Sequence, residues 1–195
     1  MVGIKGFIFK YRADSKDNYM KDTLGTKRDC GLGLRDPDFW SNDFPVWGVC
    51  GPYYRKALDI GDVIFFAPKK VSITEAGLSD YICTGILVVA NVLPSLECVM
   101  ADARLTVKYK EKYKADLDAH LKKDKERTKK VRPCNFIIGE VSKSRWFGKN
   151  KNRLTCILQK SALQNVASKL SIRRIPSLNK EQVRRIYKQL MGEEL

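Results

Sequence analysis

Apolar and polar residues alternate near the N-terminus, and the first strand is predicted there. Residues 3–11 (GIKGFIFKY) alternate well enough to bury one face of such a strand. A polar loop rich in glycine and aspartate follows, from Arg12 to Ser41. Its Gly31-Leu32-Gly33 lacks the third glycine and the following helix of a dinucleotide-binding fingerprint, so we interpret the segment as loop.

Two apolar runs between residues 57 and 92 predict a β-hairpin. Gly61 can take the positive φ that a tight turn needs, and Asp62 can hydrogen-bond its own backbone before a strand at residues 63–66 begins. The second strand, residues 81–92, is rich in β-branched and aromatic residues. Gly85 lies inside it and marks a bulge or a point of close approach.

From Leu105 onward, apolar residues recur at every fourth position. Residues 105–130 are dense in charge and lack glycine and proline, and their apolar residues form one narrow stripe: Leu105, Tyr109, Tyr113, Leu117 and Leu121. This pattern predicts a helix, with His120 on its surface. Between Lys108 and Arg132 there are eleven basic and five acidic residues, an excess of six. Such a charge run either contacts phosphates or is a solvated face stabilised by pairs one turn apart.

Strand patterns return at residues 136–141 and 154–158, and two helices close the chain. Ser161 with Gln164, and Asn179 with Gln182, have the form of capping boxes. Each of these helices has one apolar face, which we expect to pack on the strands. The basic residues expected on their outer faces are Arg173, Arg174, Arg184, Arg185 and Lys188.

The net charge of the chain indicates which class of partner to expect. Lys and Arg total 37 against 22 acidic residues, a formal charge of +15, which makes nucleic acid the first partner to consider. The alternative is that a basic composition is only the habit of the source proteome. No apolar run of about 18 residues or secretory leader is seen, so we expect no membrane span.

The loop at residues 142–153 (SKSRWFGKNKNR) carries the strongest such signal. Its acid-free sequence sets Trp146 and Phe147 among basic residues, the candidate phosphate-binding Lys143, Arg145, Lys149, Lys151 and Arg153. Cations attract backbone phosphates, and an exposed ring can stack on an unstacked base for about 1–3 kcal/mol. Alternatively, the two rings fill the end of a barrel and the cations only solvate the loop.

Cysteine and histidine usage argues against a metal site. The six cysteines form no C-x-x-C pair and His120 is the single histidine, so a zinc site of ordinary spacing is not expected, nor is a cofactor. Scattered free cysteines are typical of a reducing cytoplasm. Another segment, residues 44–55 (FPVWGVCGPYYR), sets aromatic rings beside glycines in a turn that can open onto a cavity, with core packing as the alternative for these rings.

The order of these motifs resembles a known family. WGVCGPYYRKAL, then DIGDVIFFA, ICTGILVVANVL and IIGEVSKSRWFGKNKNRL are similar to the nucleotide-modification-associated domains of the PUA-like superfamily, which includes the EVE, ASCH and YTH domains. The resemblance covers roughly residues 3–158 apart from an insertion, and it departs from the family in the first loop, at Asp14-Ser15-Lys16. It implies an α+β fold: a PUA-like small β-barrel with peripheral helices over residues 1–158, a charged helical insertion at about 105–132, and C-terminal helices over 159–195 packed on the barrel.

The resemblance also implies a function. Proteins of this superfamily hold a single base, often a modified one, and belong to DNA or RNA modification and defence systems. We therefore expect DNA or RNA as partner, a cytoplasmic location, and partner proteins from a modification or restriction system. The candidate base-pocket residues are Trp47, Cys50, Tyr53, Arg55, Trp146 and Phe147.

An enzyme remains an alternative to this binding module. The chain lacks a P-loop, the deaminase and HExxH zinc motifs, and a histidine for a serine or cysteine relay, so we assign no catalytic residue. A small hydrolase of modified nucleosides would need a lysine and a carboxylate, such as Lys56 or Lys69 with Asp62 or Glu140. A third hypothesis is a protein-interaction scaffold that docks through residues 105–130.

Overall fold

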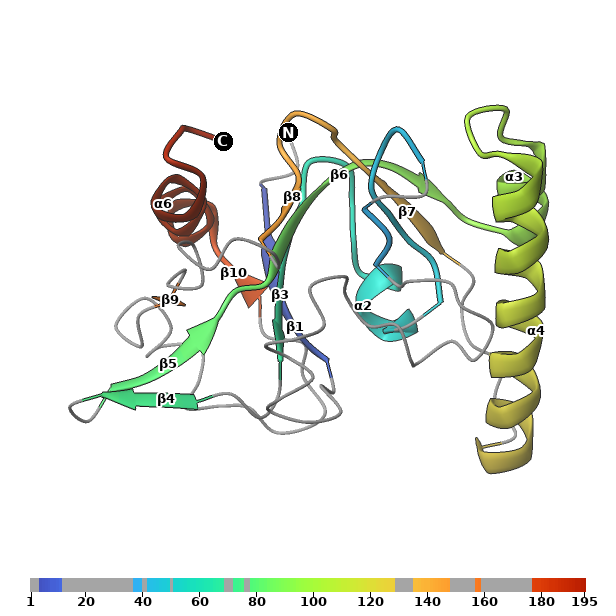
Figure 1. The fold of residues 1–195 in the computed structure, drawn as a ribbon, viewed down its shortest axis with the longest axis horizontal. Helices are drawn as coiled ribbons and strands as arrows, with labels where there is room; N and C mark the ends of the chain where they lie inside the picture. The colour runs from blue at the N-terminus through green and yellow to red at the C-terminus, as the bar shows by residue number, and fades with distance from the viewer. Residues whose placement is uncertain are drawn as a thin grey trace. The chain divides into compact units, whose positions relative to one another are not determined.

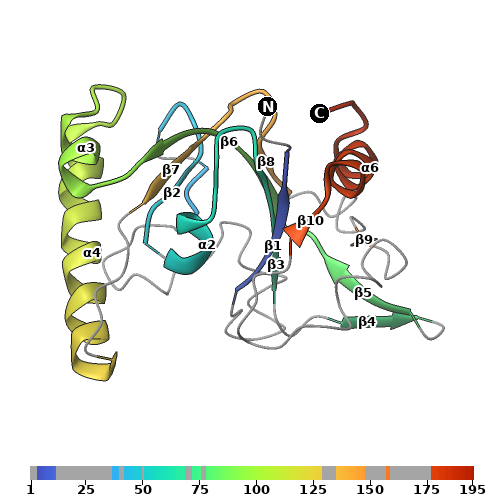
Figure 2. The same cartoon turned by 180° about the vertical axis from the view of Figure 1, so that it is seen from behind.

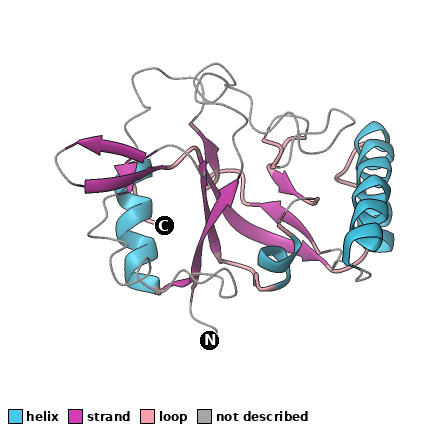
Figure 3. Cartoon of the chain, turned by 90° about the horizontal axis from the view of Figure 1, so that it is seen from below, coloured by secondary structure: helices cyan, strands magenta, loops and turns pink. Residues whose placement is uncertain are grey.

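The computed structural model describes residues 4–11, 37–39, 42–49, 51–68, 72–75, 78–128, 135–147, 157–158 and 177–195. The chain forms two compact units, and Figure 1 labels the helices and strands that belong to them. The first contains residues 1–23, 61–88 and 143–195, and the second contains residues 24–60 and 89–142. Both mix helices with strands (Figure 3), which confirms the predicted α+β class. No helix in the described part of the chain is long and apolar enough to cross a bilayer.

Strands β10, β1, β3, β6 and β8 pair in this order in the first unit. Their bounds are β1 Gly6–Tyr11, β3 Val63–Pro68, β6 Gly85–Leu93, β8 Arg145–Trp146 and β10 Ser177–Leu178. The pairing of β1 with β3 is parallel and the other pairings are antiparallel. A smaller antiparallel sheet joins β4 Ser72–Glu75, β5 Leu78–Ile82 and β9 Ile157–Leu158.

The predicted pairing of residues 63–66 with the next apolar run is confirmed, but the two strands are not consecutive. β3 pairs with β6 from Val63↔Val88 to Phe66↔Gly85, while β4 and β5 lie between them in the chain. The run predicted as one strand therefore divides into β5 and β6. The division falls at Thr84, whose backbone N–H and Oγ1 both donate to the Phe66 carbonyl, at 2.8 and 3.1 Å.

Gly61 and Asp62 form the predicted turn, with one difference in the role of the aspartate. Gly61 has φ 89°, a conformation that favours glycine. The Asp62 carboxylate is buried, and its Oδ1 accepts a hydrogen bond from the Lys5 backbone N–H at 2.9 Å. The Val63 N–H donates to the Lys5 carbonyl, also at 2.9 Å. Asp62 therefore ties the start of β1 to the start of β3 instead of serving its own turn alone.

We expect Asp62→Ala to lower the free energy of unfolding by about 1–3 kcal/mol, because the Lys5 N–H loses a buried acceptor. Asp62→Asn keeps an oxygen that can accept this bond and should lose less. Urea unfolding of the two variants measures the difference, and equal losses would contradict the assigned role.

One face of the first unit's sheet is covered by α6 Lys180–Met191, which lies beside β1 and β10 (Figures 1 and 2). The apolar residues that form this core include Ile8, Val63, Phe65, Ile86, Val88, Val183, Ile186, Tyr187 and Leu190. The predicted capping box at Asn179 is confirmed: Gln182 N–H donates to Asn179 Oδ1 at 2.9 Å, and Asn179 N–H donates to Gln182 Oε1 at 3.0 Å. The helix predicted to start at Ser161 lies outside the described residues.

The second unit pairs residues 89–93 of β6 with β7, and β7 with β2, all antiparallel. Its other elements are β2 Val46–Trp47, α2 Pro52–Lys56, α3 Leu96–Ala101, α4 Val107–Thr128 and β7 Phe136–Gly139. The register between β6 and β7 shifts at Ala90, between the pairs Val89↔Gly139 and Asn91↔Ile138. This bulge, not Gly85, is the irregularity of β6.

The stripe predicted at residues 105–121 is confirmed: its residues from Tyr109 onward form the buried face of α4, and Leu105, two residues before the helix, packs in the same core. Leu105, Tyr109, Tyr113 and Leu117 are buried, and the partly buried Leu121 packs against the same core. Phe136 lies edge-on to Tyr113, with ring centroids 4.9 Å apart and an interplanar angle of 77°. Thr106 Oγ1 caps the helix start by accepting from the Tyr109 N–H at 3.2 Å.

The closed barrel implied by the resemblance is not formed by the described strands. β10 and β8 are the outer strands of the first unit's sheet, and β2 is an outer strand of the second unit's sheet; within the described residues, neither sheet pairs its two outer strands. Two-residue strands such as β2, β8 and β10 offer few hydrogen bonds for closure. The predicted boundary at residue 158 stays a prediction, since residues 159–176 lie outside the described part of the chain.

Candidate functional site

Residues 143–147 of the first unit form a short segment that hydrogen bonds attach to α6, β6 and Thr84, through the side chain at Ser144 and through the backbone elsewhere. Tyr187 Oη donates to the Lys143 carbonyl at 3.1 Å, and the Val88 N–H donates to Ser144 Oγ at 3.0 Å. β8 pairs with β6, and the Phe147 N–H donates to the Thr84 carbonyl at 2.9 Å. The segment predicted as loop therefore contains a strand, and its first residues are held rigidly.

Trp146 packs directly on the backbone of Gly85. A Cβ added at Gly85 would lie 2.8 Å from Trp146 Cζ3 and would also overlap Cε3. The backbone of Gly85 is paired with Phe66 on one side and with Trp146 on the other, so it cannot shift away from the indole without breaking this pairing. This contact confirms the predicted close approach at Gly85.

An aromatic row continues from Trp146 across the sheet. The ring centroid of Phe66 lies 6.2 Å from that of Trp146, and Phe9 lies edge-on to Phe66 at 5.9 Å. Trp146 keeps part of its surface exposed, whereas Phe9 and Phe66 are buried. The indole is thus the partly exposed end of an otherwise buried row.

Cations flank this ring in the sequence. Lys143 and Arg145 are exposed, and their role as phosphate-binding residues stays a prediction. Consecutive residues of a strand point to opposite faces, so Arg145 and Phe147 lie on the α6 side and Trp146 on the other. Phe147 is buried in the core that α6 covers. This agrees with the alternative prediction for this ring, in which it fills the interior and does not contact a base. The other candidate phosphate-binding residues, Lys149, Lys151 and Arg153, lie outside the described residues.

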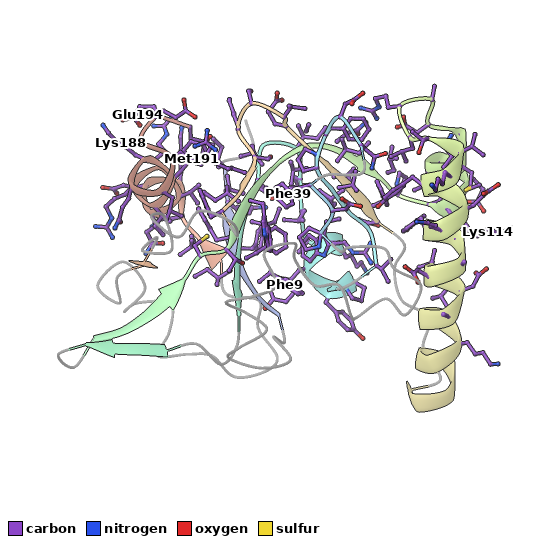
Figure 4. The ribbon with its side chains drawn as sticks, in the orientation of Figure 1. Phe9, Phe39, Lys114, Lys188, Met191 and Glu194 are labelled. Atoms are coloured by element: carbon purple, nitrogen blue, oxygen red, sulfur yellow. The ribbon has the colours of Figure 1, made fainter. Side chains whose placement is uncertain are left out.

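The pKa of the Tyr187 hydroxyl reflects the charged residues on the α6 side of β8. Burial raises the pKa of Tyr187, Glu193 raises it further, and Arg145 opposes them. The guanidinium of Arg145 is therefore close enough to α6 to act on this hydroxyl. Arg184, Arg185 and Lys188 of α6 are exposed, as predicted. Lys188 Nζ lies 2.6 Å from Glu194 Oε1 (Figure 4). This ion pair raises the pKa of Lys188 and partly neutralises its charge.

Three of the four candidates from the turn at residues 44–55 can be located, and they belong to the second unit. Trp47 is 0% exposed and Arg55 is 1% exposed, whereas Tyr53 is 67% exposed. Arg55 Nη2 donates to the Val49 carbonyl at 3.0 Å, so the side chain fastens α2 to the end of β2. A base cannot reach the covered ring of Trp47 without displacing neighbours. Cys50 lies outside the described residues.

The residues considered for a hydrolase do not form a buried pair. Lys56 and Glu140 are exposed, and the Asp62 carboxylate accepts from Lys5 N–H. Lys69 lies outside the described residues. Among the described residues, no group of three or more His, Cys, Asp and Glu side chains is placed to hold a metal ion.

Two contributors to this site were missed by the sequence-based prediction. Tyr187 belongs to the apolar stripe of α6, so its pattern predicts only a core residue; no signal shows that its hydroxyl reaches the Lys143 carbonyl. Phe66 lies in a continuous apolar strand, and its partner is decided by the pairing of β6 with β8.

Comparison with protein-family models, with curated proteins and with solved structures gave no match for this chain.

Proposed function

We propose that this protein is a nucleic-acid-binding module that recognises a base, in particular a modified one, within a DNA or RNA modification or defence system. The observation that carries the proposal is the partly exposed end of the aromatic row, Trp146, which is fixed on β8 directly after the exposed cation Arg145 and three residues after the exposed Lys143. The PUA-like relationship, the cytoplasmic location and partner proteins from such a system belong to the same proposal.

Rigid placement favours stacking on this ring. Each rotamer-rich side chain that becomes ordered on binding costs about 0.5–1.5 kcal/mol, and any loop that becomes ordered adds to this cost. The backbone of residues 143–147 is already held by β6, Thr84 and Tyr187, so little ordering is left for the ligand to drive. Stacking on an aromatic ring contributes about 1–3 kcal/mol per base, which can offset the few kcal/mol needed to unstack that base.

The alternation along β8 sets how a nucleotide would lie. Arg145 is on the α6 side of the strand and Trp146 on the other, so the ligand would cross the edge of β8 with its phosphate near Arg145 and its base on the indole. A base inside a duplex cannot reach such a ring. The proposal therefore specifies a single-stranded or extruded nucleotide.

The test begins with capture of cellular nucleic acid on the purified protein, digestion to nucleosides, and comparison with the input by mass spectrometry. Enrichment of one modified nucleoside would support a base-reading site. Retention of nucleic acid without enrichment would reduce the protein to a backbone binder.

The cations give a second, quantitative prediction. In K143Q/R145Q, two phosphate contacts are removed, and the slope of log affinity against log salt should fall in magnitude by about 1.4, at about 0.7 per contact on a single strand. The variant K110Q/K114Q removes the same charge from α4 and serves as the matched control. Equal slopes for both variants would contradict the placement of phosphates on β8.

A further inference from the structure

Residues 192–195, which follow α6, fold back against the first unit (Figure 1). Gly192 has φ 77°, the left-handed conformation that ends many helices, and its N–H donates to the Lys188 carbonyl at 2.9 Å. Leu195 packs against the core that α6 covers. Between these two residues, Glu193 and Glu194 are exposed. We call these two glutamates the acidic pair.

The acidic pair lies beside the cations of α6. Glu194 Oε1 accepts a hydrogen bond from Lys188 Nζ at 2.6 Å (Figure 4), and this bond lowers the pKa of the Glu194 carboxyl. Arg184, one turn before Lys188, lowers this pKa further. One carboxylate of the pair thus acts on two exposed cations of the helix.

The acidic pair also acts at the edge of β8. Tyr187 Oη donates to the Lys143 carbonyl, so the last turns of α6 lie against the start of the segment that carries Trp146. Burial raises the pKa of Tyr187, Glu193 raises it further, and Arg145 opposes them. Glu193 therefore acts on the same oxygen as Arg145, the cation proposed to hold a phosphate.

The cations concerned form one group around Tyr187. Arg184 is three residues before Tyr187 and Lys188 is one residue after it, so both lie on the adjoining flank of α6, one turn apart. Arg145 faces α6 from β8. A phosphate chain that leaves Arg145 toward α6 can continue along Lys188 and Arg184, which are the two cations that Glu194 acts on.

The stability of α6 does not explain the acidic pair. The C-terminal end of an α-helix is the negative end of its dipole, so carboxylates near this end are unfavourable for the helix. The ion pair of Lys188 with Glu194 leaves these side chains 64% and 67% exposed, and ion pairs this exposed contribute little to folding. The position of the acidic pair beside the cations is the feature that calls for a role.

We propose that the acidic pair is an internal competitor of the nucleic-acid backbone: it partly neutralises Arg145, Lys188 and Arg184 in the free protein, and bound phosphates displace it. This inference rests on the proposed function, because it concerns regulation of the same site. Attraction of backbone phosphates does not depend on the base, so the acidic pair weakens the binding of every strand. A larger share of the affinity must then come from the base that stacks on Trp146.

Binding of a short single-stranded DNA of mixed sequence tests the proposal. At about 0.1 M salt, E193Q/E194Q should bind roughly 2- to 10-fold more tightly than the unmodified protein, and the gain should largely vanish at about 1 M, where charges are screened within about 3 Å. E97Q/D118N, which removes the same charge from exposed positions of the second unit, is the matched control. Equal gains for the two variants would mean that only net charge matters and would overturn the proposal.

A double-mutant cycle locates the competition. E194Q makes Lys188 available for one more phosphate, so the slope of log affinity against log salt should rise in magnitude by about 0.7. In the K188Q background this partner is absent, and E194Q should have a much smaller effect. Equal effects in the two backgrounds would contradict competition at Lys188. Urea unfolding should show nearly equal stabilities for E194Q and the unmodified protein, so tighter binding does not come from folding.

The combined results separate this inference from the proposed function. A loss of affinity in K143Q/R145Q without a gain in E193Q/E194Q would keep the site on β8 and overturn the internal competition. A gain in E193Q/E194Q without a loss in K143Q/R145Q would keep the competition at α6 and overturn the site on β8. Failure of the unmodified protein and of E193Q/E194Q to bind nucleic acid would overturn both.

Discussion

The Gly85→Ala variant is expected to lose about 1–3 kcal/mol of folding free energy, because the added methyl group overlaps the indole of Trp146. Gly85 lies between β3 and β8 and cannot move aside without breaking its pairing with Phe66 and Trp146. Urea unfolding measures the loss. Displacement of the ring should also weaken binding of nucleic acid by the same variant.

A double-mutant cycle isolates the contact. In G85A/W146A the ring that the methyl group meets is absent, so the cost of G85A should largely disappear when it is measured in the W146A background. Additive losses would mean that Gly85 is required for another reason, and the packing of Trp146 on its backbone would not explain the glycine.

Trp146→Leu is expected to weaken binding of single-stranded nucleic acid by about 5- to 150-fold, the equivalent of losing one stacked base at about 1–3 kcal/mol. Leucine keeps an apolar side chain over Gly85 and Phe66 but offers no ring face. Fluorescence anisotropy on a labelled single strand measures the affinity, and mass spectrometry of bound nucleosides shows whether enrichment is lost.

Phe147→Leu is the matched control for this variant. It removes the neighbouring ring, which is buried on the α6 side of the same ribbon, so it should reduce stability without changing which nucleosides are bound. If Phe147→Leu abolishes enrichment and Trp146→Leu does not, the base does not stack on the indole.

Regular elements with a clear period could be predicted from the sequence. The stripe from Leu105 to Leu121 indicates α4 and its buried face, because the apolar residues recur at the period of a helix. The capping box at Asn179 locates the start of α6, since it depends on two residues only three positions apart. Such signals are local, so one sequence contains them completely.

Pairing between distant segments could not be predicted in the same way. β8 has two residues and hence no period, and it becomes a strand only because Gly85 and Ile86 lie opposite it. The apolar run at residues 81–92 also shows no break where β5 ends and β6 begins, so it is predicted as one strand. For the candidate site, the pattern identified Lys143, Arg145 and Trp146 as a group, but it could not distinguish the half-buried Trp146 from the fully buried Trp47.

The strand β6 gives residues 85–88 to the core of one unit and residues 89–93 to the sheet of the other. Each unit is also assembled from segments that alternate along the chain, so neither can be cut out as one continuous piece. Local opening of either unit must free one end of a strand that the other unit also uses. We therefore expect the two units to share one cooperative unfolding transition, despite having separate cores.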